Sequence, residues 1–329
     1  MAAQEASKRP PCNTLAAEHC YQAFRRHPRA TDALELVKQV ALVPLIPIRL
    51  FILLLAVCLY CACSGFAPPR VLRFFARIVS LALGFYKLQV RLCDKDGSLA
   101  KSAFVGVSGR SACEILGVKE KYGGVVSVHR SWCDIPLLLA CMDVGFVARE
   151  SVRHVPIVSK GCRDIGCVFV QRENGSGGNA ARITKRLREA MEDDKVRPLA
   201  VFAEGTTSNG DGFLPFRSGA FVASVPLLPA TIEFKWRKFN PCWETISFLS
   251  HLYGILTQVH NEAVITLYPV VENDKDASPK EAASALTEKV AAWTNWPVFN
   301  VGLAHKRVYH RWLSGECSAD DFEHNVAAL

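Results

Sequence analysis

A long apolar segment near the N-terminus constrains this chain more strongly than any other feature. Residues 50–67 contain no charged side chain, and a helix needs about 20 apolar residues to cross a bilayer. Pro44, Pro47 and Arg49 interrupt the start of this apolar region, which begins at Val40. A straight helix from Val40 would therefore be kinked and would carry a charge into lipid. The pattern predicts a membrane-associated helical segment.

A second helix is predicted over residues 71–86, directly after two consecutive prolines. Arg70, Arg73 and Arg77 lie among its apolar side chains, which is typical of a helix at the level of the lipid headgroups. Because basic residues flank the apolar run on both sides, the positive-inside rule assigns no single orientation. We expect a kinked or re-entrant helical pair with both ends in the cytosol. A single span and a very apolar helix inside a soluble core are the alternatives.

Composition narrows the classes of partner. The chain carries a formal net charge of +8 over 329 residues, without zinc-finger spacing, RNA-binding aromatic motifs or a block of Lys and Arg. We therefore expect no nucleic-acid partner, and an anionic membrane surface or a phosphorylated substrate instead. The thirteen cysteines are scattered and odd in number, which favours reduced thiols in a protein facing the cytosol. Cys162 and Cys167 form no C-x2-C pair, so no metal site is expected.

Four regions follow from these patterns. Residues 1–38 form a basic N-terminal tail, 39–87 the membrane-associated helical segment, 88–272 a domain of the α/β class, and 273–329 a C-terminal helix and tail. Within the third region, apolar runs of strand type alternate with amphipathic segments. The predicted strands cover 88–92, 104–107, 125–128, 145–149, 166–172, 199–202, 231–234 and 264–270. The predicted helices cover 135–142, 179–194 and 279–293.

The strand over 125–128 leads to a histidine and an aspartate that are five residues apart. His129 and Asp134 would lie about 140° apart around a continuous helix, so a shared helix face does not explain their spacing. Pro136 fits the first turn of a helix, which places Asp134 near a helix N-terminus after a strand-to-helix turn. There the carboxylate can hold one ring nitrogen and leave the other as a general base for a hydroxyl group. A structural histidine next to an aspartate that only caps the helix is the alternative.

Two further predicted strands end in polar residues. The run 166–172 ends at Arg172, and the run 199–202 is followed by Glu204. Ligands gather outside the carboxyl ends of strands in open α/β sheets, so we expect His129, Arg172 and Glu204 to share one face.

Together these segments resemble the glycerolipid acyltransferase superfamily, whose members carry four ordered motifs. Residues 129–134 are similar to H-x4-D, 166–172 to G-x-x-F-[IV]-x-R, 202–206 to F-P-E-G-T, and 225–229 to a hydrophobic segment with two prolines. The resemblance covers about residues 35–272 and implies a mixed central sheet flanked by helices, preceded by the membrane-embedded helical segment. Finer features resemble the lysophosphatidylcholine and lysophosphatidylethanolamine acyltransferases: residues 47–50, 168–173, 206–210, 216–221 and 241–247.

The resemblance implies an enzyme, an O-acyltransferase that moves an acyl group from acyl-CoA to the free hydroxyl group of a lysophospholipid. It implies that His129 is the general base and that Asp134 orients its ring. Acyl-CoA is then a co-substrate, and neither a cofactor nor a metal is expected. The expected partners are acyl-CoA, the lysophospholipid acceptor and the lipid bilayer.

The resemblance also implies roles in substrate binding. Arg172 and Arg217 would hold the acceptor phosphate, because a guanidinium group matches phosphate oxygens in a bidentate fork. Glu204, Gly205 and Thr206 would shape the site around the glycerol, with glycine allowing close backbone approach. An ion pair between Glu204 and Arg172 is the alternative for the carboxylate, and surface ion pairs are the alternative for the two arginines.

One residue departs from the family pattern. Ala203 stands where the family usually has proline, and we expect a looser turn with an altered rate or acceptor preference rather than loss of activity. Acylation of lysophosphatidic acid, a CoA-independent transacylase and an inactive membrane scaffold are the rival functions. The resemblance implies the endoplasmic reticulum membrane as the location, with the catalytic domain facing the cytosol.

Overall fold

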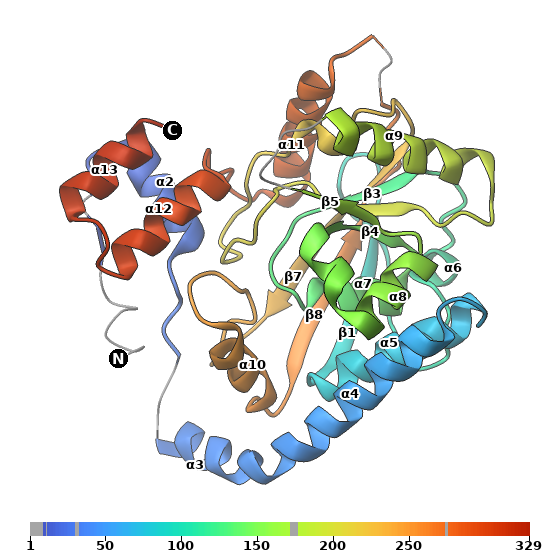
Figure 1. The fold of residues 1–329 in the computed structure, drawn as a ribbon, viewed down its shortest axis with the longest axis horizontal. Coiled ribbons are helices and arrows are strands. Elements are labelled where there is room, and N and C mark those ends of the chain that lie inside the picture. The colour runs from blue at the N-terminus through green and yellow to red at the C-terminus, as the bar shows by residue number, and fades with distance from the viewer. Residues whose placement is uncertain (1–8, 11, 30–32, 172–176, 274–275) are drawn as a thin grey trace.

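The computed structural model describes residues 9–10, 12–29, 33–171, 177–273 and 276–329. Within these residues an eight-stranded sheet forms the centre of the molecule (Figure 1). Its strands lie in the order β2-β1-β8-β7-β3-β6-β4-β5. Their bounds are β1 Phe85–Cys93, β2 Leu99–Phe104, β3 Gly124–Ser127, β4 Gly145–Arg149, β5 Val168–Val170, β6 Leu199–Phe202, β7 Leu227–Lys235 and β8 Asn261–Leu267.

The strand pairs are both parallel and antiparallel, which confirms the predicted α/β class with a mixed sheet. β3 lies parallel to both β6 and β7, and β4 lies parallel to both β6 and β5. β7 and β8 are antiparallel, as are β1 and β2 at the edge of the sheet. Because β3, β6 and β4 are parallel neighbours, the loops after their carboxyl ends meet at one edge. The candidate functional residues lie in those loops.

Helices flank the sheet (Figure 1). α5 packs against α7 and β1, and α9 packs against β5 and β6. The α-helices are α2 Leu15–Phe24, α3 Ala33–Leu42, α4 Ile46–Cys63, α5 Pro69–Ala82, α6 Ala112–Leu116, α7 Asp134–Cys141, α8 Pro156–Asp164, α9 Gly177–Glu192, α10 Phe248–Leu256, α11 Pro279–Thr294, α12 Leu303–Leu313 and α13 Ala319–Ala327. The short 3-10 helices are η1 Val43–Leu45, η2 Glu150–His154 and η3 Ser218–Ala220.

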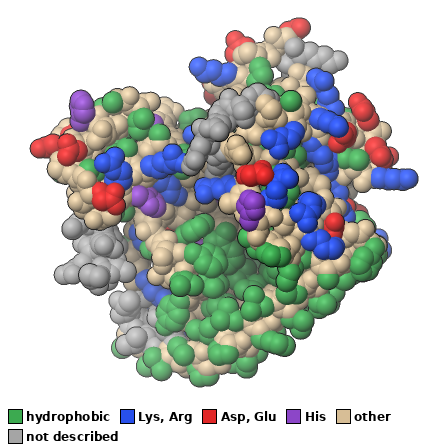
Figure 2. All heavy atoms as spheres, viewed as in Figure 1, with side chains coloured by type: hydrophobic (Ala, Val, Ile, Leu, Met, Phe, Trp, Pro, Cys, Tyr) green, Lys and Arg blue, Asp and Glu red, His purple; other side chains and the backbone are tan. Residues whose placement is uncertain are grey.

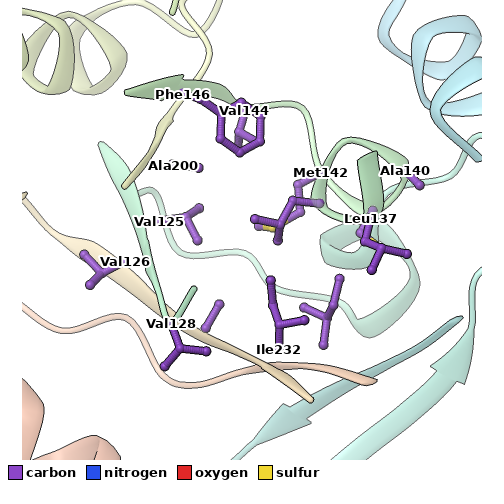
Figure 3. Packing of buried hydrophobic residues seen from close by; sticks show 14 of the residues in the cluster. Val125, Val126, Val128, Leu137, Ala140, Met142, Val144, Phe146, Ala200 and Ile232 are labelled. Atoms are coloured by element: carbon purple, nitrogen blue, oxygen red, sulfur yellow. The ribbon is translucent and has the colours of Figure 1, made fainter. Parts of the chain in front are cut away.

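The core between β3 and α7 fixes the turn that joins them. The side chains of β3 are fully buried, as the near-continuous apolar pattern of a parallel strand requires. Figure 3 shows Leu137 of α7 and Met142, just beyond that helix, on the side of β3 toward which Val125 points. All three are at most 2% exposed. This packing holds the end of β3 and the start of α7 in a fixed relation, and the turn between them carries His129 and Asp134.

The apolar segment forms a helical pair, because α4 and α5 pack against each other. The stretch Val40–Cys63 is long and apolar enough to cross a membrane, judged by length and composition. A 3-10 turn at Pro44 separates α3 from α4. One face of α4 packs on the domain, whereas the opposite face, which includes Phe51 at 67% exposure, is open. The choice between a single span and a re-entrant arrangement stays a prediction.

Two of the arginines that suggested a helix among lipid headgroups, Arg73 and Arg77, lie inside the protein instead. Arg77 is buried and donates hydrogen bonds to the carbonyl oxygens of Val105, Phe85 and Tyr86 at 3.0, 2.6 and 2.8 Å. Arg73 is likewise buried and bonded to a backbone carbonyl. Buried carbonyl groups need donors, and the sequence does not reveal which basic side chain will reach them.

The two ends of the chain form a unit of their own, which we call the terminal helix unit: α2, α12 and α13. Phe24 of α2, Tyr309 of α12 and Phe322 of α13 are at most 2% exposed and share a small apolar core. Figure 1 shows the unit beside the main domain. The sequence pattern predicts only tails here, because each helix is short and buries its apolar side mainly against the other two.

Replacing Arg77 by methionine should destabilise the fold by about 3 kcal/mol, because three buried carbonyl oxygens would lose their donor. The midpoint of thermal unfolding of the detergent-solubilised protein measures the effect. Arg70→Met in the same helix is the control, since the side chain of Arg70 is 69% exposed and reaches Glu114 only at 3.9 Å. Equal midpoints for the two variants would show that the Arg77 bonds contribute nothing.

Candidate active site

A single carboxylate oxygen organises the turn between β3 and α7. Oδ2 of Asp134, the first residue of α7, accepts a hydrogen bond from Nδ1 of His129 at 2.8 Å. The same oxygen accepts from the backbone N–H groups of Arg130 and Ser131 at 2.7 and 2.9 Å. A carboxylate only accepts, so the proton of a neutral His129 ring lies on Nδ1 and Nε2 is unprotonated. Asp134 thus both closes the turn and orients the ring of His129.

The imidazole ring of His129 is held in place and is partly open to solvent. It stacks on Phe202 with 4.1 Å between ring centroids and 12° between ring planes, and Phe202 stacks in turn on Phe146. The His129 side chain is 16% exposed, and Nε2 has no hydrogen-bond partner among the described residues. An oriented ring with an available nitrogen can take a proton from a hydroxyl group.

The end of β6 brings Glu204 against the backbone of His129. One carboxylate oxygen accepts from the N–H of His129, and the other accepts from the N–H of Leu214 at 2.7 Å. Burial raises the pKa of Glu204 to about 7, although the charge of Arg130 opposes the rise. Both oxygens are engaged inside the protein, so Glu204 fixes the backbone that carries His129. To bind substrate directly, the Glu204 carboxylate would have to give up its hydrogen bonds to the N–H groups of His129 and Leu214.

The other predicted binding residues lie around the same loop or outside the described residues. Gly205 has a φ of +72°, a conformation that favours glycine, and a Cβ there would lie 2.9 Å from Nε of Arg217. Arg217 is exposed, and Thr206 is buried in the loop. Arg172 lies outside the described residues. The structure therefore brings His129, Glu204 and the Gly205–Arg217 pair to one edge of the sheet.

Arg130 is a buried support for the site that the sequence analysis missed. Its Nη1 donates to Oγ of Ser208 at 2.6 Å and to the carbonyl oxygen of Gly212 at 2.5 Å. Its guanidinium group lies 5.0 Å from the ring centroid of Trp296. The N–H of Ser208 in turn donates to the carbonyl oxygen of His129 at 3.1 Å. The position inside H-x4-D gave no signal, because the motif leaves this residue unspecified.

Lys306 connects the terminal helix unit to the active-site loop. Its Nζ donates to the backbone oxygen and to Oγ1 of Thr207 at 2.8 and 2.7 Å. Burial lowers the pKa of Lys306 to about 8, and the nearby Glu244 carboxylate opposes the shift. Thr207 directly precedes Ser208, whose N–H holds the His129 carbonyl. Lys306, a residue near the C-terminus, therefore holds the loop whose next residue is bonded to the backbone of the candidate base. No local sequence signal indicates this.

A histidine of α10 also contacts the turn between β3 and α7. Nε1–H of Trp132 donates to Nδ1 of His251 at 3.0 Å, and Nε2–H of His251 donates to the carbonyl oxygen of Pro241 at 2.9 Å. Burial lowers the pKa of His251 to about 4, and the charge of Arg26 lowers it further. A neutral His251 with a fixed tautomer therefore ties α10 to the turn between His129 and Asp134.

Comparison with known proteins places this site in a family. A family model described as Acyltransferase matches residues 119–233. Lysophospholipid acyltransferase LPEAT1 of Arabidopsis thaliana is 34% identical over 257 residues, which cover 75% of this chain and 64% of the plant protein. A lyso-ornithine lipid O-acyltransferase of Brucella abortus is 30% identical over 210 residues, which cover 57% of this chain and 68% of the bacterial protein.

The chain belongs to the glycerolipid acyltransferase superfamily. This confirms the resemblance drawn from the four motifs. The crystal structure of the 1-acyl-sn-glycerophosphate acyltransferase PlsC from Thermotoga maritima confirms the fold. It matches with a TM-score of 0.50 and 18% identity, over 78% of this chain and 95% of that chain. The chain spans 64% of the length of the plant relative.

The departure from the family motif at Ala203 has a structural consequence in this chain. The N–H of Ala203 donates to the carbonyl oxygen of Ser127 at 3.1 Å, and the Ala203 carbonyl accepts from the N–H of Arg217 at 2.8 Å. A proline could not make the first of these bonds, because it has no N–H. Ala203 therefore adds a hydrogen bond between the ends of β3 and β6 instead of loosening the turn. Its effect on rate or acceptor preference stays a prediction.

Lys306→Met should lower both stability and the rate of acyl transfer. The loss of a buried donor to Thr207 should cost about 2–3 kcal/mol, and a displaced active-site loop should lower kcat about tenfold or more. The control is Arg307→Met, because Arg307 is the exposed neighbour in the same helix. Thermal unfolding and initial rates measure the two effects. A lower unfolding temperature with an unchanged kcat would show that Lys306 does not position the site.

His251 should make the protein less stable in mild acid. Its folded pKa of about 4 lies below the ordinary value of 6.5, so the unfolded chain binds the proton first as the pH falls. Stability that is present above pH 6.5 is therefore lost toward pH 4, by about 2 kcal/mol between pH 7 and pH 5. Thermal unfolding of the wild type and His251→Gln at both pH values measures the difference. An equal loss in the two proteins would contradict a buried neutral His251.

Proposed function

We propose that this acyltransferase moves an acyl group from acyl-CoA to the free hydroxyl group of a lysophospholipid. The observation that carries the proposal is the 2.8 Å bond between Nδ1 of His129 and Oδ2 of Asp134, which leaves Nε2 available as a base. The acceptor class is supported by the plant relative, which is a lysophospholipid acyltransferase.

In the proposed reaction, Nε2 of His129 takes the proton of the acceptor hydroxyl group while the oxygen attacks the thioester carbonyl carbon. The carbon–sulfur bond then breaks, and the imidazolium gives its proton to the leaving CoA thiolate. An ester and free CoA result. Asp134 stabilises the imidazolium through the bond to Nδ1–H. The proposed reaction forms no covalent acyl-enzyme and uses acyl-CoA as a co-substrate, without a further cofactor.

The acceptor phosphate is the proposed ligand of Arg172 and Arg217. Arg217 is exposed next to Gly205, and its guanidinium group makes no hydrogen bond to a described residue. A guanidinium group in such a position can bind two phosphate oxygens at once. We propose choline or ethanolamine headgroups, because residues 168–173, 206–210 and 241–247 resemble segments of the lysophosphatidylcholine and lysophosphatidylethanolamine acyltransferases. Lysophosphatidic acid is the rival acceptor.

Both substrates carry fatty chains, so we propose that the protein docks on a bilayer through the open apolar face of α4. The thirteen cysteines are all free thiols, which supports a catalytic domain on the cytosolic side. The endoplasmic reticulum membrane is the proposed location, from the likeness to lysophospholipid acyltransferases.

Membranes that contain this chain should incorporate labelled acyl groups from acyl-CoA into lysophosphatidylcholine or lysophosphatidylethanolamine. His129→Ala should lower the initial rate by about 10²- to 10⁴-fold, because general-base catalysis contributes that much. Asp134→Asn should cause a loss in the same range, because the ring would lose its fixed tautomer. His154→Ala, at an exposed histidine in η2, is the matched control and should keep the wild-type rate.

Equal rates for His129→Ala and His154→Ala would contradict the proposed base. Preferred product from lysophosphatidic acid would favour the rival acceptor, and product from a phospholipid donor without acyl-CoA would identify a transacylase. The absence of histidine-dependent product from every acceptor would favour an inactive membrane scaffold.

A further inference from the structure

Helix α10 presents an apolar face that the protein does not cover. His251, Gly254 and Ile255 face the interior and are buried. On the opposite side Phe248 is 46% exposed and Leu249 is 74% exposed. Tyr253 adds to the same face, and the sequence of α10 contains no Asp, Glu, Lys or Arg. Large exposed apolar areas mark contact surfaces.

The position of α10 against the domain is tightly fixed, so the exposed face is not the product of loose packing. A Cβ on Gly254 would lie 2.2 Å from the ring of Phe239, which shows how closely the helix approaches its support. His251 adds bonds to Trp132 and Pro241 on the buried side. The helix therefore cannot turn its apolar face inward without breaking these contacts.

The C-terminal end of α10 is bonded to the membrane-type helix α4. Arg49 of α4 donates to the carbonyl oxygens of Leu256 and Gln258, at the end of α10, at 2.6 and 3.0 Å. The guanidinium group also bonds the hydroxyl oxygen of Tyr86 at 3.0 Å. Figure 2 shows hydrophobic side chains forming a continuous area over α4 and the neighbouring surface toward α10. Arg49, the charged residue that interrupts the apolar segment, is thus buried inside the protein, where its hydrogen bonds join α4 to α10.

The same helix reaches the candidate active site. Trp132, which lies between His129 and Asp134 in the sequence, has its ring centroid 5.4 Å from that of Phe248. Phe248 begins the exposed face of α10. An apolar surface therefore runs from α4 across α10 to the turn that carries the candidate base.

We propose that α10 is a second membrane-contacting element, which lies in the surface of the bilayer beside α4 and borders the entrance for the lipid acceptor. The proposal rests on the proposed docking of α4, and extends it to a helix far away in the sequence. A lipid surface is the favoured occupant because the face is continuous with that of α4 and carries no charge. With nine residues, α10 is too short to span a bilayer, so it lies along the interface.

Photocrosslinking in vesicles tests the contact without requiring turnover. A benzophenone amino acid replaces Leu249, Phe51 or Leu99 in the full chain, which is reconstituted into vesicles of radiolabelled phosphatidylcholine. Phe51 on α4 reports docking itself. Leu99 on β2 is the matched control, since it is an exposed leucine that pairs with Cys93, at the end of β1 away from the Tyr86 that Arg49 of α4 contacts. Light should attach labelled lipid at positions 51 and 249, and at least tenfold less at position 99.

Label at position 51 but not at position 249 would overturn the role of α10 and leave the docking of α4 intact. Label at neither position would overturn both. A crosslink from position 249 to a second copy of the chain, without lipid, would show that a protein interface covers this face, and would likewise overturn the proposal.

Kinetics supply a second measurement. Leu249→Ser should raise KM for lysophosphatidylcholine presented in vesicles about twofold to threefold, because a leucine contributes modestly to burial in lipid. Leu99→Ser should leave KM unchanged. Equal KM values for the two variants, together with the absence of lipid label at position 249, would reject a contact between α10 and the membrane.

Discussion

The geometry of the site depends on one oxygen atom, Oδ2 of Asp134. It accepts from the ring of His129 and from the backbone N–H groups of the next two residues, so the shape of the turn and the orientation of the ring have the same cause. Charge-assisted hydrogen bonds of this kind are the stronger ones in proteins. Glu204 adds a hold on the backbone N–H of His129 from the neighbouring strand. Asp134 thus holds both the ring and the backbone of the turn, and Glu204 holds the backbone at one further point.

The supports of this turn come from distant parts of the chain. Lys306, in the terminal helix unit, holds the loop after β6. The backbone N–H of Trp243 donates to the carbonyl oxygen of Arg130 at 2.8 Å. His251 holds Trp132 from α10, which borders the apolar face of α4. The turn between β3 and α7 therefore contacts the sheet, the loop held by the terminal helix unit, and α10.

Local patterns in the sequence were sufficient for the strand-to-helix turn, because His129 and Asp134 are only five residues apart. The parallel strands that bring Glu204 to the same edge were also predictable, since their apolar runs are short and distinct. The role of Lys306 was not predictable, because its burial depends on packing between the two ends of the chain. The burial of Arg77 was not predictable for a related reason. Its partners are backbone carbonyl groups, which every sequence contains, so no residue pattern marks them.

The protonation of the His129 ring provides the most direct test of this arrangement. Nuclear magnetic resonance of the ¹⁵N-histidine-labelled protein, with His129→Gln to assign the signals, distinguishes the two ring nitrogens. The bond to Asp134 predicts that the neutral form of the ring carries its proton on Nδ1 and leaves Nε2 unprotonated, and Asp134→Asn should change that pattern. A neutral ring with its proton on Nε2 in the wild-type protein would contradict His129 as the base.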